Sequence, residues 1–359
     1  MTSNNQYRVA IVGATGAVGN EVKKVLEQRN FPVKELVPFA SDRSVGKEIS
    51  FNGKMFSCKK LEEGCFSGVD IAFFDISDEL SLKWVPQATE EGAWVIDNSA
   101  TFRYEKDIPI VVPEVNGKKF ISFLKSTDTF SARQKILTGP NCSTSQMVVA
   151  LKPILDRWGI KRVVVSTYQS TSGAGAAALD ELKNQSLDFI NNKSISSEVF
   201  PHQIAFNCLP HVGSFQDDGY TSEEQKMLIE SRKIFGIEDF KLTATAVRVP
   251  TFSCHAESIN VECEKSFEMN DVLEALRHQE GVIVLDDPSQ SIYPLNQTAA
   301  GDKVPGSAGQ DPVYVGRVRR DFTVESGLNL WVVSDNLRKG AALNAVQVGE
   351  LLVQNVSNL

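Results

Sequence analysis

The sequence has no long apolar run, no excess of positive charge and no Cys-x-x-Cys pair. An apolar run of about 18 residues would be needed to predict a transmembrane helix. The formal net charge of −8 at pH 7 argues against non-specific binding to nucleic acid or to a membrane surface, because both require clustered positive charge. The six cysteines are spaced for neither a zinc site nor a disulfide framework, so we expect a reducing compartment and no metal.

The chain also lacks the charged and apolar segments of a secretory signal peptide, since Met1–Gln6 is polar. We therefore expect a cytoplasmic protein. Internal repeats and low-complexity tracts are missing from the sequence too. The composition, 42% hydrophobic and 23% charged, is typical of a soluble globular protein, and a length of 359 residues indicates two domains.

Strands that alternate with helices predict a parallel, doubly wound sheet in the first half of the chain. Arg8–Val12 is almost entirely apolar and runs into Gly13, as a buried parallel strand does. We expect a helix over Asn20–Gln28 and further strands near Glu35–Phe39, Asp70–Phe74 and Trp94–Ile96. The polar stretch from Gly117 to Thr138 is interpreted as an irregular excursion between domains.

The second half alternates apolar and polar residues in several segments, which favours an α+β domain with a mixed sheet. We expect strands at Val163–Ser166, Thr243–Val249, Ser258–Glu264 and Val313–Glu325, and helices at Ser143–Leu155, Ala176–Ile190, Ser222–Phe235 and Ala341–Gln354. Pro153 is expected to kink or end the first of these helices. The predicted domains are residues 1–138, Rossmann-like and completed by a C-terminal helix within 339–359, and residues 139–338.

A glycine-rich turn, Gly13–Gly19, follows the first strand and opens the first helix. Its glycines would let a pyrophosphate approach the backbone, where the helix N-terminus supplies N–H donors. The candidate cofactor contacts in this turn are Gly13, Thr15, Gly16, Ala17 and Val18. A tight turn without a ligand is the alternative.

The residues after the second strand indicate which nicotinamide dinucleotide is bound. An NAD site places an acidic residue there to accept a hydrogen bond from the ribose 2′-OH, and Asp42 is such a residue. Arg43, flanked by the hydroxyls of Ser41 and Ser44, suits the 2′-phosphate of NADP instead. We predict a preference for NADP.

One cysteine, Cys142, lies in Gly139–Thr144, just before a long apolar helical pattern. At the start of a helix, unpaired backbone N–H groups and the helix dipole favour a thiolate. A thiolate is the nucleophile that covalent acyl chemistry requires. Considered alone, a cysteine is more often a small buried apolar side chain, so the prediction depends on the motifs that accompany it.

The segment Ser166–Gly175 follows a predicted strand and precedes a predicted helix. Small residues such as Ser172 and Gly173 would let a flat ring or an acyl chain approach the backbone, while Gln169 offers both a donor and an acceptor. An ordinary strand-to-helix loop is the alternative.

Arg248 and His255 stand seven residues apart, with Pro250 between them. On an unbroken strand this odd spacing would place them on opposite faces. Because proline is excluded from central strands, we expect a bend that turns both towards one cleft. The Arg248 guanidinium suits a carboxylate, and the His255 imidazole can exchange protons near neutral pH. A purely structural histidine is the alternative.

Thr221 is expected to cap the helix that follows it, with Glu224 completing a capping box. Glu223 is then left without a structural task, and Lys226, three residues further on, lies on the same helix face. The pair is interpreted either as a solvated ion pair or as partners for a substrate ammonium and a phosphate.

Taken together and in this order, the motifs closely resemble those of the bacterial aspartate-β-semialdehyde dehydrogenases, over essentially the whole chain. The resemblance is carried by Gly13–Gly19, Pro140–Thr144, Gln169 with Ser172–Gly175, Asp218–Thr221, Arg248–His255 and Asp335–Ala341. It implies an NADP-dependent enzyme that interconverts aspartyl phosphate with aspartate semialdehyde and phosphate, in the biosynthesis of lysine, threonine and methionine. It also implies a catalytic and dimerisation domain, and a homodimer or a tetramer of dimers.

By the same resemblance, Cys142 would be the acyl-accepting nucleophile and His255 the general acid and base. Gln169 would orient the thioacyl intermediate. Arg248 and Glu223 would hold the carboxylate and the ammonium of the aspartyl group. Phosphate would be bound by Arg103, Asn141 and Lys226, and the nicotinamide carboxamide by Asn336.

The sequence departs from the family pattern at Asp75, where a Ser-Ala-Gly turn is common and an acidic group would disfavour a nearby pyrophosphate. Cys254 stands where a glycine is frequent. Three alternative functions stay open. An N-acetylglutamyl-phosphate reductase needs no ammonium partner such as Glu223, a malonyl-CoA reductase needs space for CoA rather than a phosphate pocket, and a catalytically idle relative would have no use for Cys142 and His255.

Overall fold

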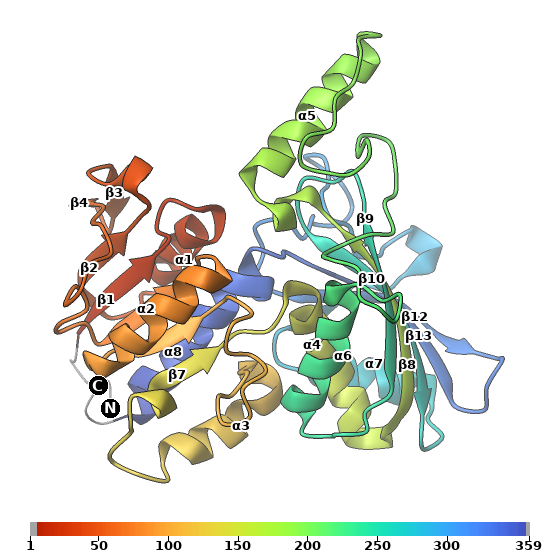
Figure 1. The fold of residues 1–359 in the computed structure, drawn as a ribbon. Helices are drawn as coiled ribbons and strands as arrows, with labels where there is room; N and C mark the ends of the chain where they lie inside the picture. Colours follow the sequence, from red (N-terminus) through yellow and green to blue (C-terminus); the bar gives the residue numbers. More distant parts are fainter. Residues whose placement is uncertain (1–5, 357–359) are drawn as a thin grey trace. The chain divides into compact units, whose positions relative to one another are not determined.

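The structure, a computed structural model, describes residues 6–356. Over these residues the chain divides into two units, each built around a large β-sheet (Figure 1). The first unit comprises the chain up to Asn141 together with the chain from Ala341 onward. The second unit runs from Cys142 to Gly340.

The large sheet of the first unit has the strand order β2-β1-β5-β6-β7, and all neighbouring strands in it are parallel. Its elements are β1 (Tyr7–Val12), α1 (Ala17–Gln28), β2 (Val33–Phe39), the hairpin β3 (Glu48–Phe51) and β4 (Lys54–Ser57), β5 (Ile71–Phe74), α2 (Asp78–Glu90), β6 (Trp94–Asp97), α3 (Pro113–Leu124), β7 (Ile136–Thr138) and α8 (Leu343–Asn355). The predicted Rossmann-like parallel sheet is confirmed.

Helices cover both faces of this sheet, which is why its strands are apolar throughout. In β1, Val9 and Ile11 join the apolar cluster formed with α1, α3 and α8, whereas Ala10 and Val12 point to the opposite face and join the cluster that includes α2. The C-terminal helix therefore completes the core of the first unit.

The predicted irregular excursion over 117–138 is wrong, because this segment contains most of α3 and the edge strand β7. In α3, Phe120 and Leu124 are four residues apart and buried, while Lys118 and Lys119 are exposed. The helix packs against α8, where a Cβ on Gly117 would lie 3.6 Å from a Leu351 methyl carbon. The lysines that made the segment look irregular are the solvent face of an amphipathic helix.

The sheet of the second unit is mixed, with the strand order β11-β12-β13-β10-β8-β9. Its elements are α4 (Cys142–Trp158), β8 (Ile160–Gln169), α5 (Ala176–Ile190), α6 (Ser222–Phe235), β9 (Leu242–Arg248), β10 (His255–Cys263), α7 (Met269–His278), β11 (Val282–Val284), β12 (Val313–Asp321) and β13 (Gly327–Ser334). The helices α4, α6 and α7 contact the sheet, while α5 extends away from it (Figure 1). The predicted mixed sheet is confirmed.

Of the two outcomes expected at Pro153, a kink or an end of the helix, the structure excludes the end, because α4 continues to Trp158. A proline inside a helix removes one backbone hydrogen bond. The helix is held instead by its packing, since Met147–Leu151 and Ile154 are fully buried. α4 also begins earlier than expected, at Cys142 itself.

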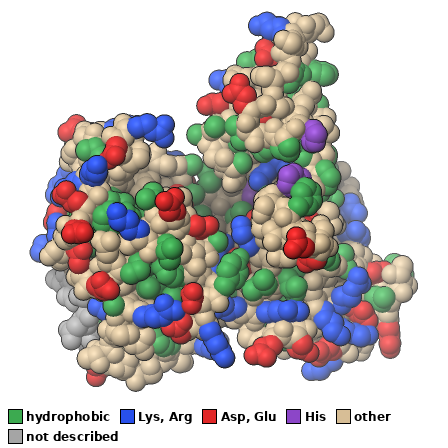
Figure 2. Space-filling view, in the orientation of Figure 1, with side chains coloured by type: hydrophobic (Ala, Val, Ile, Leu, Met, Phe, Trp, Pro, Cys, Tyr) green, Lys and Arg blue, Asp and Glu red, His purple; other side chains and the backbone are tan. Residues whose placement is uncertain are grey.

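Lysine and arginine side chains are mixed with aspartate and glutamate side chains over the face that Figure 2 shows. Among the helices of residues 6–356, none combines the length and the apolar character needed to cross a membrane.

Candidate active site

Cys142 is the first residue of α4 and is partly exposed. No acidic side chain lies in the first turn of this helix, so the backbone N–H groups and the helix dipole act on the thiol unopposed from that turn. Gly340 packs against this residue so closely that a Cβ at position 340 would lie 2.7 Å from the Cys142 Cβ. The glycine of the Asp335–Ala341 motif therefore provides the space for the candidate nucleophile.

Gln169, Arg248 and His255 lie side by side because they sit at the ends of three neighbouring strands. Gln169, the last residue of β8, is the register partner of Arg248 in β9 and of His255 in β10. Cross-strand partners in a sheet lie on the same face. Gly173 closes this group, since its Cβ would lie 3.1 Å from the Arg248 guanidinium and 3.3 Å from His255 Nε2.

The bend around Pro250 thus lies between β9 and β10, and Arg248 and His255 are brought together as the sequence predicted. Arg248 is 7% exposed, and its guanidinium donates to the Ser170 carbonyl at 2.7 Å. Burial lowers the pKa of Arg248, while the charges of Glu223 and the Cys142 thiolate act in the opposite direction. Cys142 and Glu223 are therefore near enough to Arg248 to interact with it.

One backbone group decides which nitrogen of His255 carries the proton. The Ser170 N–H donates to His255 Nδ1 at 3.1 Å, so a neutral imidazole holds its proton on Nε2. His255 is fully buried, and burial followed by the charge of Arg248 lowers its pKa to about 3. Nε2 has no hydrogen-bond partner in the part of the chain that the structure describes. The imidazole therefore presents an unused N–H donor.

Glu223 connects α6 to this group of side chains. Gln169 Nε2 donates to Glu223 Oε1 at 3.2 Å, and Lys226 Nζ lies 3.5 Å from Glu223 Oε2. The predicted capping box of Thr221 and Glu224 is confirmed, and it fixes the first turn of α6, in which Glu223 lies. The predicted ion pair is present, with Glu223 buried and Lys226 partly exposed.

Asn336 is held by three donors on one oxygen. Its Oδ1 accepts hydrogen bonds from Ser170 Oγ at 3.2 Å, Ser172 Oγ at 3.1 Å and the Cys254 N–H at 3.0 Å. Its Nδ2 group is then the part of the amide left to donate to a ligand carbonyl. The sequence did not single out Ser170, although its position directly after Gln169 offered a signal.

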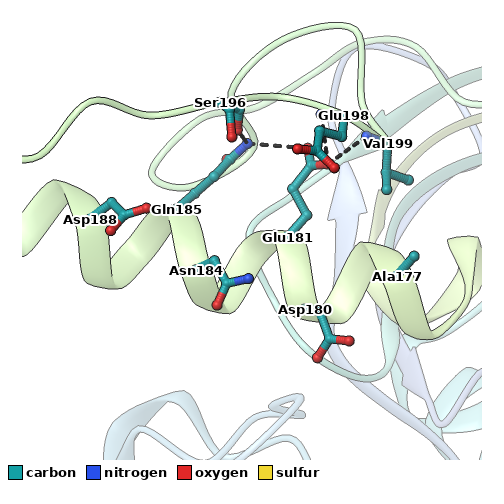
Figure 3. Close-up of a pocket in the computed structure, with 9 residues that line it drawn as sticks. All are labelled: Ala177, Asp180, Glu181, Asn184, Gln185, Asp188, Ser196, Glu198 and Val199. Atoms are coloured by element: carbon teal, nitrogen blue, oxygen red, sulfur yellow. Dashed lines mark hydrogen bonds between the residues drawn. The ribbon is translucent and has the colours of Figure 1, made fainter.

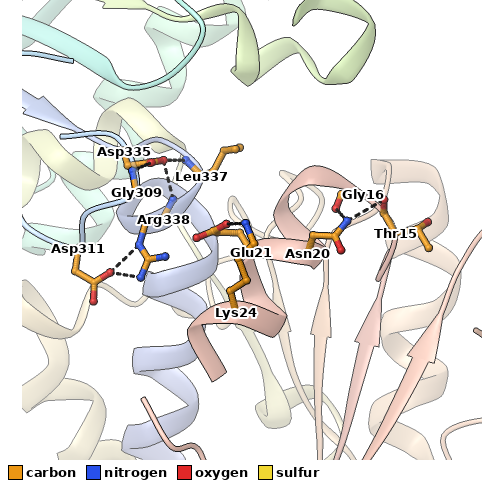
Figure 4. Close-up of polar contacts among 10 residues, drawn as sticks. All are labelled: Thr15, Gly16, Asn20, Glu21, Lys24, Gly309, Asp311, Asp335, Leu337 and Arg338. Carbon is orange, nitrogen blue, oxygen red and sulfur yellow. Dashed lines mark hydrogen bonds and ion pairs between the residues drawn. The ribbon is translucent and has the colours of Figure 1, made fainter. Parts of the chain in front are cut away.

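Hydrogen bonds to two carboxylates, those of Asp335 and Asp311, fix the loop that carries Asn336 (Figure 4). Asp335 accepts hydrogen bonds from the Gly309 and Leu337 N–H groups at 2.7 and 2.9 Å. Arg338 Nε donates to Asp311 at 2.7 Å. These contacts hold the backbone around Asn336, in addition to the hydrogen bonds that its own Oδ1 accepts.

In the first unit, the glycine turn is packed closely against the backbone that follows β5. Gly13 has a φ of +91°, and a Cβ there would lie 2.2 Å from the Asp75 carbonyl oxygen. Asn20 Nδ2 donates to the Thr15 and Gly16 carbonyl oxygens, which closes the turn (Figure 4). No side chain caps α1 and no acidic residue lies in its first turn, so its N-terminus suits an anion.

The turn also lies at the position where parallel α/β sheets bind dinucleotides. The strand order reverses between β2-β1 and β5, and the crevice at such a switch point is the usual ligand site. After β2, Asp42 forms an ion pair with Lys60 at 3.0 Å, while Arg43 is exposed. Of the two charged side chains after β2, Arg43 is therefore the one without this ion pair.

Comparisons with known proteins decide the family. Models for the NAD binding domain and the dimerisation domain of semialdehyde dehydrogenases match residues 8–122 and 151–339. The sequence is 51% identical to the aspartate-semialdehyde dehydrogenase of Aquifex aeolicus, over 97% of this chain and 98% of that protein, and 45% identical to that of Shewanella violacea, over 98% and 99%. A crystal structure of aspartate semialdehyde dehydrogenase II from Vibrio cholerae, complexed with ASA, matches with a TM-score of 0.90 at 46% identity, over 98% of this chain and 99% of that one.

The chain belongs to the aspartate-semialdehyde dehydrogenase family. It is therefore an oxidoreductase, and the resemblance predicted from the sequence motifs is confirmed. The match to the NAD binding domain supports a nicotinamide cofactor at the glycine turn.

Both sequence departures from other aspartate-semialdehyde dehydrogenases have structural consequences. Cys254 adopts a φ of +67°, a left-handed conformation that glycine adopts without strain. Asp75 is partly buried beside the glycine turn, with Oδ2 3.8 Å from where a Cβ on Gly16 would lie. Burial, and secondarily the charge of Asp97, raises the pKa of Asp75 to about 6.

Arg103 and Asn141, which were predicted to bind phosphate together with Lys226, lie in the first unit. Arg103 is 6% exposed and its guanidinium donates to the Asn98 carbonyl. Asn141, the residue before Cys142, is also buried. No cluster of three or more metal-binding side chains occurs within residues 6–356.

An acidic cavity of about 260 Å³ lies beside α5 and contains none of the predicted site residues (Figure 3). Glu181 in this cavity accepts backbone N–H hydrogen bonds from Glu198 and Val199, and Gln185 donates to the Ser196 carbonyl. Its buried polar groups therefore hold the loop that follows α5.

Proposed function

We propose that the chain catalyses the reversible, NADP-dependent reductive dephosphorylation of L-aspartyl 4-phosphate to L-aspartate 4-semialdehyde. The observation that carries the proposal is the group formed by Gln169, Arg248 and His255 at three strand ends, with Cys142 interacting with the same guanidinium. The relatives support this substrate, since each is named for aspartate semialdehyde and one was solved in complex with ASA.

In the biosynthetic direction, the Cys142 thiolate attacks the acyl carbon of aspartyl phosphate. A carbon–sulfur bond forms, the carbon–oxygen bond to phosphate breaks, and inorganic phosphate leaves with the electron pair. The Arg248 guanidinium matches the substrate carboxylate and the Glu223 carboxylate matches the ammonium group. We assign phosphate binding to Arg103, Asn141 and Lys226.

His255 acts through its Nε2–H. In the resting tautomer this group donates a hydrogen bond to the oxygen that gains negative charge in each tetrahedral intermediate. When the thiohemiacetal anion collapses, the carbon–oxygen double bond reforms, the carbon–sulfur bond breaks, and the electron pair leaves with Cys142 as the thiolate. Gln169 orients the thioester beside it. The nicotinamide cofactor supplies the hydride, and its ring is assigned to Ser172, Gly173 and the Asn336 amide.

We assign NADP rather than NAD because Asp42 is engaged by Lys60 whereas Arg43 is exposed. The 2′-phosphate of NADP would lie by Arg43, Ser41 and Ser44. Arg43→Ala should then lower kcat/KM for NADP by about 10-fold or more and leave the NAD value little changed. Equal losses with both cofactors would refute the assignment.

Phosphate-dependent formation of NADPH from aspartate semialdehyde tests the proposal as a whole. A requirement for N-acetylglutamate semialdehyde, or for CoA in place of phosphate, would favour the corresponding alternative reductase, and no activity with any of these would favour an idle relative. Cys142→Ala should abolish turnover and leave NADP affinity, measured by fluorescence titration, unchanged. Retained turnover in this variant would exclude covalent catalysis.

We further propose that the chain forms a homodimer through its second unit and acts in the synthesis of lysine, threonine and methionine. The match of residues 151–339 to a dimerisation domain supports the oligomer. Restoration of growth in a bacterium that lacks its own enzyme and requires these amino acids tests the pathway role.

A further inference from the structure

A buried carboxyl group that the reaction does not use lies two residues from His255. Glu257 follows His255 on β10, and side chains two apart on a strand share a face. The Glu257 side chain is 0% exposed. Neither of its carboxyl oxygens has a hydrogen-bond partner within residues 6–356. A carboxylate buried without donors is costly, so this group needs an explanation.

The neighbours of Glu257 bring no charge to it. Its register partners are Thr167 in β8 and Val332 in β13, and from α4 it interacts with the amide of Gln146. Burial raises the pKa of Glu257 well above its ordinary value, and in the described chain only Gln146 opposes that shift. Burial therefore favours the protonated form of this carboxyl group, which has an O–H to donate.

Gln146 offers the matching acceptor. Its Nε2 donates to the His255 carbonyl at 3.2 Å, which fixes the orientation of the amide, because the opposite orientation would bring two carbonyl oxygens together. Gln146 Oε1 is then directed elsewhere and has no donor among the described residues. A proton on Glu257, donated to Gln146 Oε1, would satisfy both groups.

This contact links the two elements that carry the proposed chemistry. Gln146 lies one helical turn after Cys142 on α4, four residues along, so both side chains lie on the same helix face. The Gln146 amide in turn holds the backbone of His255, the first residue of β10.

We propose that Glu257 is a positioning residue, whose carboxyl O–H donates to Gln146 Oε1 and thereby locks α4, with Cys142, onto β10, with His255. The catalytic consequence rests on the proposed roles of Cys142 and His255, whereas the hydrogen bond itself does not. An ionised Glu257 would break the link and place a negative charge beside the imidazole.

Substitutions that separate charge from hydrogen bonding test the proposal. In Glu257→Gln, an amide N–H replaces the carboxyl O–H, so we expect kcat within about threefold of wild type and an unchanged pH profile. In Glu257→Leu the donor is lost, so kcat should fall about 10-fold with the KM for aspartate semialdehyde nearly unchanged. Gln146→Leu should have a similar effect, and the double variant should be no worse than either single one. Glu262→Gln, the same exchange on the outer part of β10, is the matched control.

Infrared spectroscopy gives a readout that does not depend on activity. The native protein should show the carbonyl band of a protonated carboxylic acid near pH 8, and Glu257→Gln should lack it. The proposal is overturned if this band is missing, if Glu257→Gln loses as much activity as Glu257→Leu, or if Glu257→Leu is fully active. If Glu257→Leu does not fold, the infrared carbonyl band of the native protein and the activity of Glu257→Gln still test the proposal. If the native chain has no dehydrogenase activity, the proposed function fails while the infrared result still tests the hydrogen bond.

Discussion

Gly340 is the residue whose replacement tests the placement of the nucleophile most directly. An alanine there would put its Cβ 2.7 Å from Cys142 Cβ and 3.1 Å from Cys142 Cα, so the backbone at the start of α4 has to move. Because a shift of about 1 Å at a reacting group costs on the order of 10²-fold in rate, Gly340→Ala should lower kcat by roughly that factor. Steady-state assays should show the loss in kcat rather than in the KM for NADP.

Gly117→Ala is the control, since position 117 lies in α3 without a positive φ and a Cβ there would make only ordinary contacts, 3.6 Å from Leu351 and 3.8 Å from Pro113. It adds a methyl group to a helix of the first unit, so its kcat should stay close to that of the native enzyme. An equal loss in both variants would mean that the Gly340 effect is not steric.

Asp75 makes stability depend on pH in the direction opposite to that of a carboxylate held by a positive charge or by hydrogen bonds. Its pKa is raised from 3.8 to about 6, so between these values the folded state binds more protons than the unfolded state. Stability therefore falls as the pH rises through this window and does not recover above it. Asp75→Asn should stabilise the protein by up to about 3 kcal/mol near pH 8 and have little effect near pH 4.

Urea unfolding at the two pH values measures this difference. Asp128→Asn, an exposed carboxylate in the same unit, is the control and should show no such dependence. A loss of stability in Asp75→Asn near pH 8 would mean that the charged form is favoured in the folded state, contrary to the burial argument.

At the scale of the helix, the start of α6 links stability to substrate binding. Thr221 and Glu224 close the first turn, and Glu223 lies within it. Thr221→Ala should cost about 1 kcal/mol in the free energy of unfolding and also raise the KM for aspartate semialdehyde, because Glu223 loses its fixed position. Ser77→Ala, which removes the cap of α2 in the other unit, should lower stability without changing KM. Equal KM effects in both variants would contradict the role given to Glu223.

The helices α5 and α6 could be predicted with the bounds that the structure shows, because each begins after a recognisable glycine or capping residue. The helix α3 and the strand β7 could not. The buried face of α3 is recognisable through its contacts with α8, which lies more than 200 residues later in the chain, and β7 has only three residues. β13 was missed for a related reason, since it is recognisable chiefly as the partner of β10 and β12.

Cys142, Arg248 and His255 could be predicted as candidate site residues from their residue types and from the helix start and the proline that lie near them in the sequence. Their grouping is a consequence of strand register, which places Gln169 between the other two strand ends, and no local pattern states that register. Ser170 and Glu257 were missed because their tasks, a backbone N–H for an imidazole and a buried neutral acid, depend on neighbours from other elements.

At the scale of the whole molecule, one face of the second unit's sheet is the candidate surface for a second copy of the chain. The helices α4, α6 and α7 contact the sheet, yet Tyr168 and Ser258 in its inner strands are exposed, and Tyr168 packs on Trp331 with ring centroids 5.5 Å apart. A cavity of about 380 Å³ opens beside Ser258 and Trp331. This face belongs to the region that matches a dimerisation domain.

Ser258→Arg should therefore weaken the dimer. Ser258 is the register partner of Ser166 and of Trp331, so it lies centrally on this face, and an arginine from each copy would place two like charges in one interface. We expect sedimentation equilibrium to show a dissociation constant raised about 10-fold or more. Ser50→Arg is the matched control, because it adds the same charge to an exposed strand residue of the first unit and should leave the constant unchanged. A native chain that is monomeric at micromolar concentration would refute the homodimer itself, whereas a dimer unaffected by Ser258→Arg would move the interface to another surface.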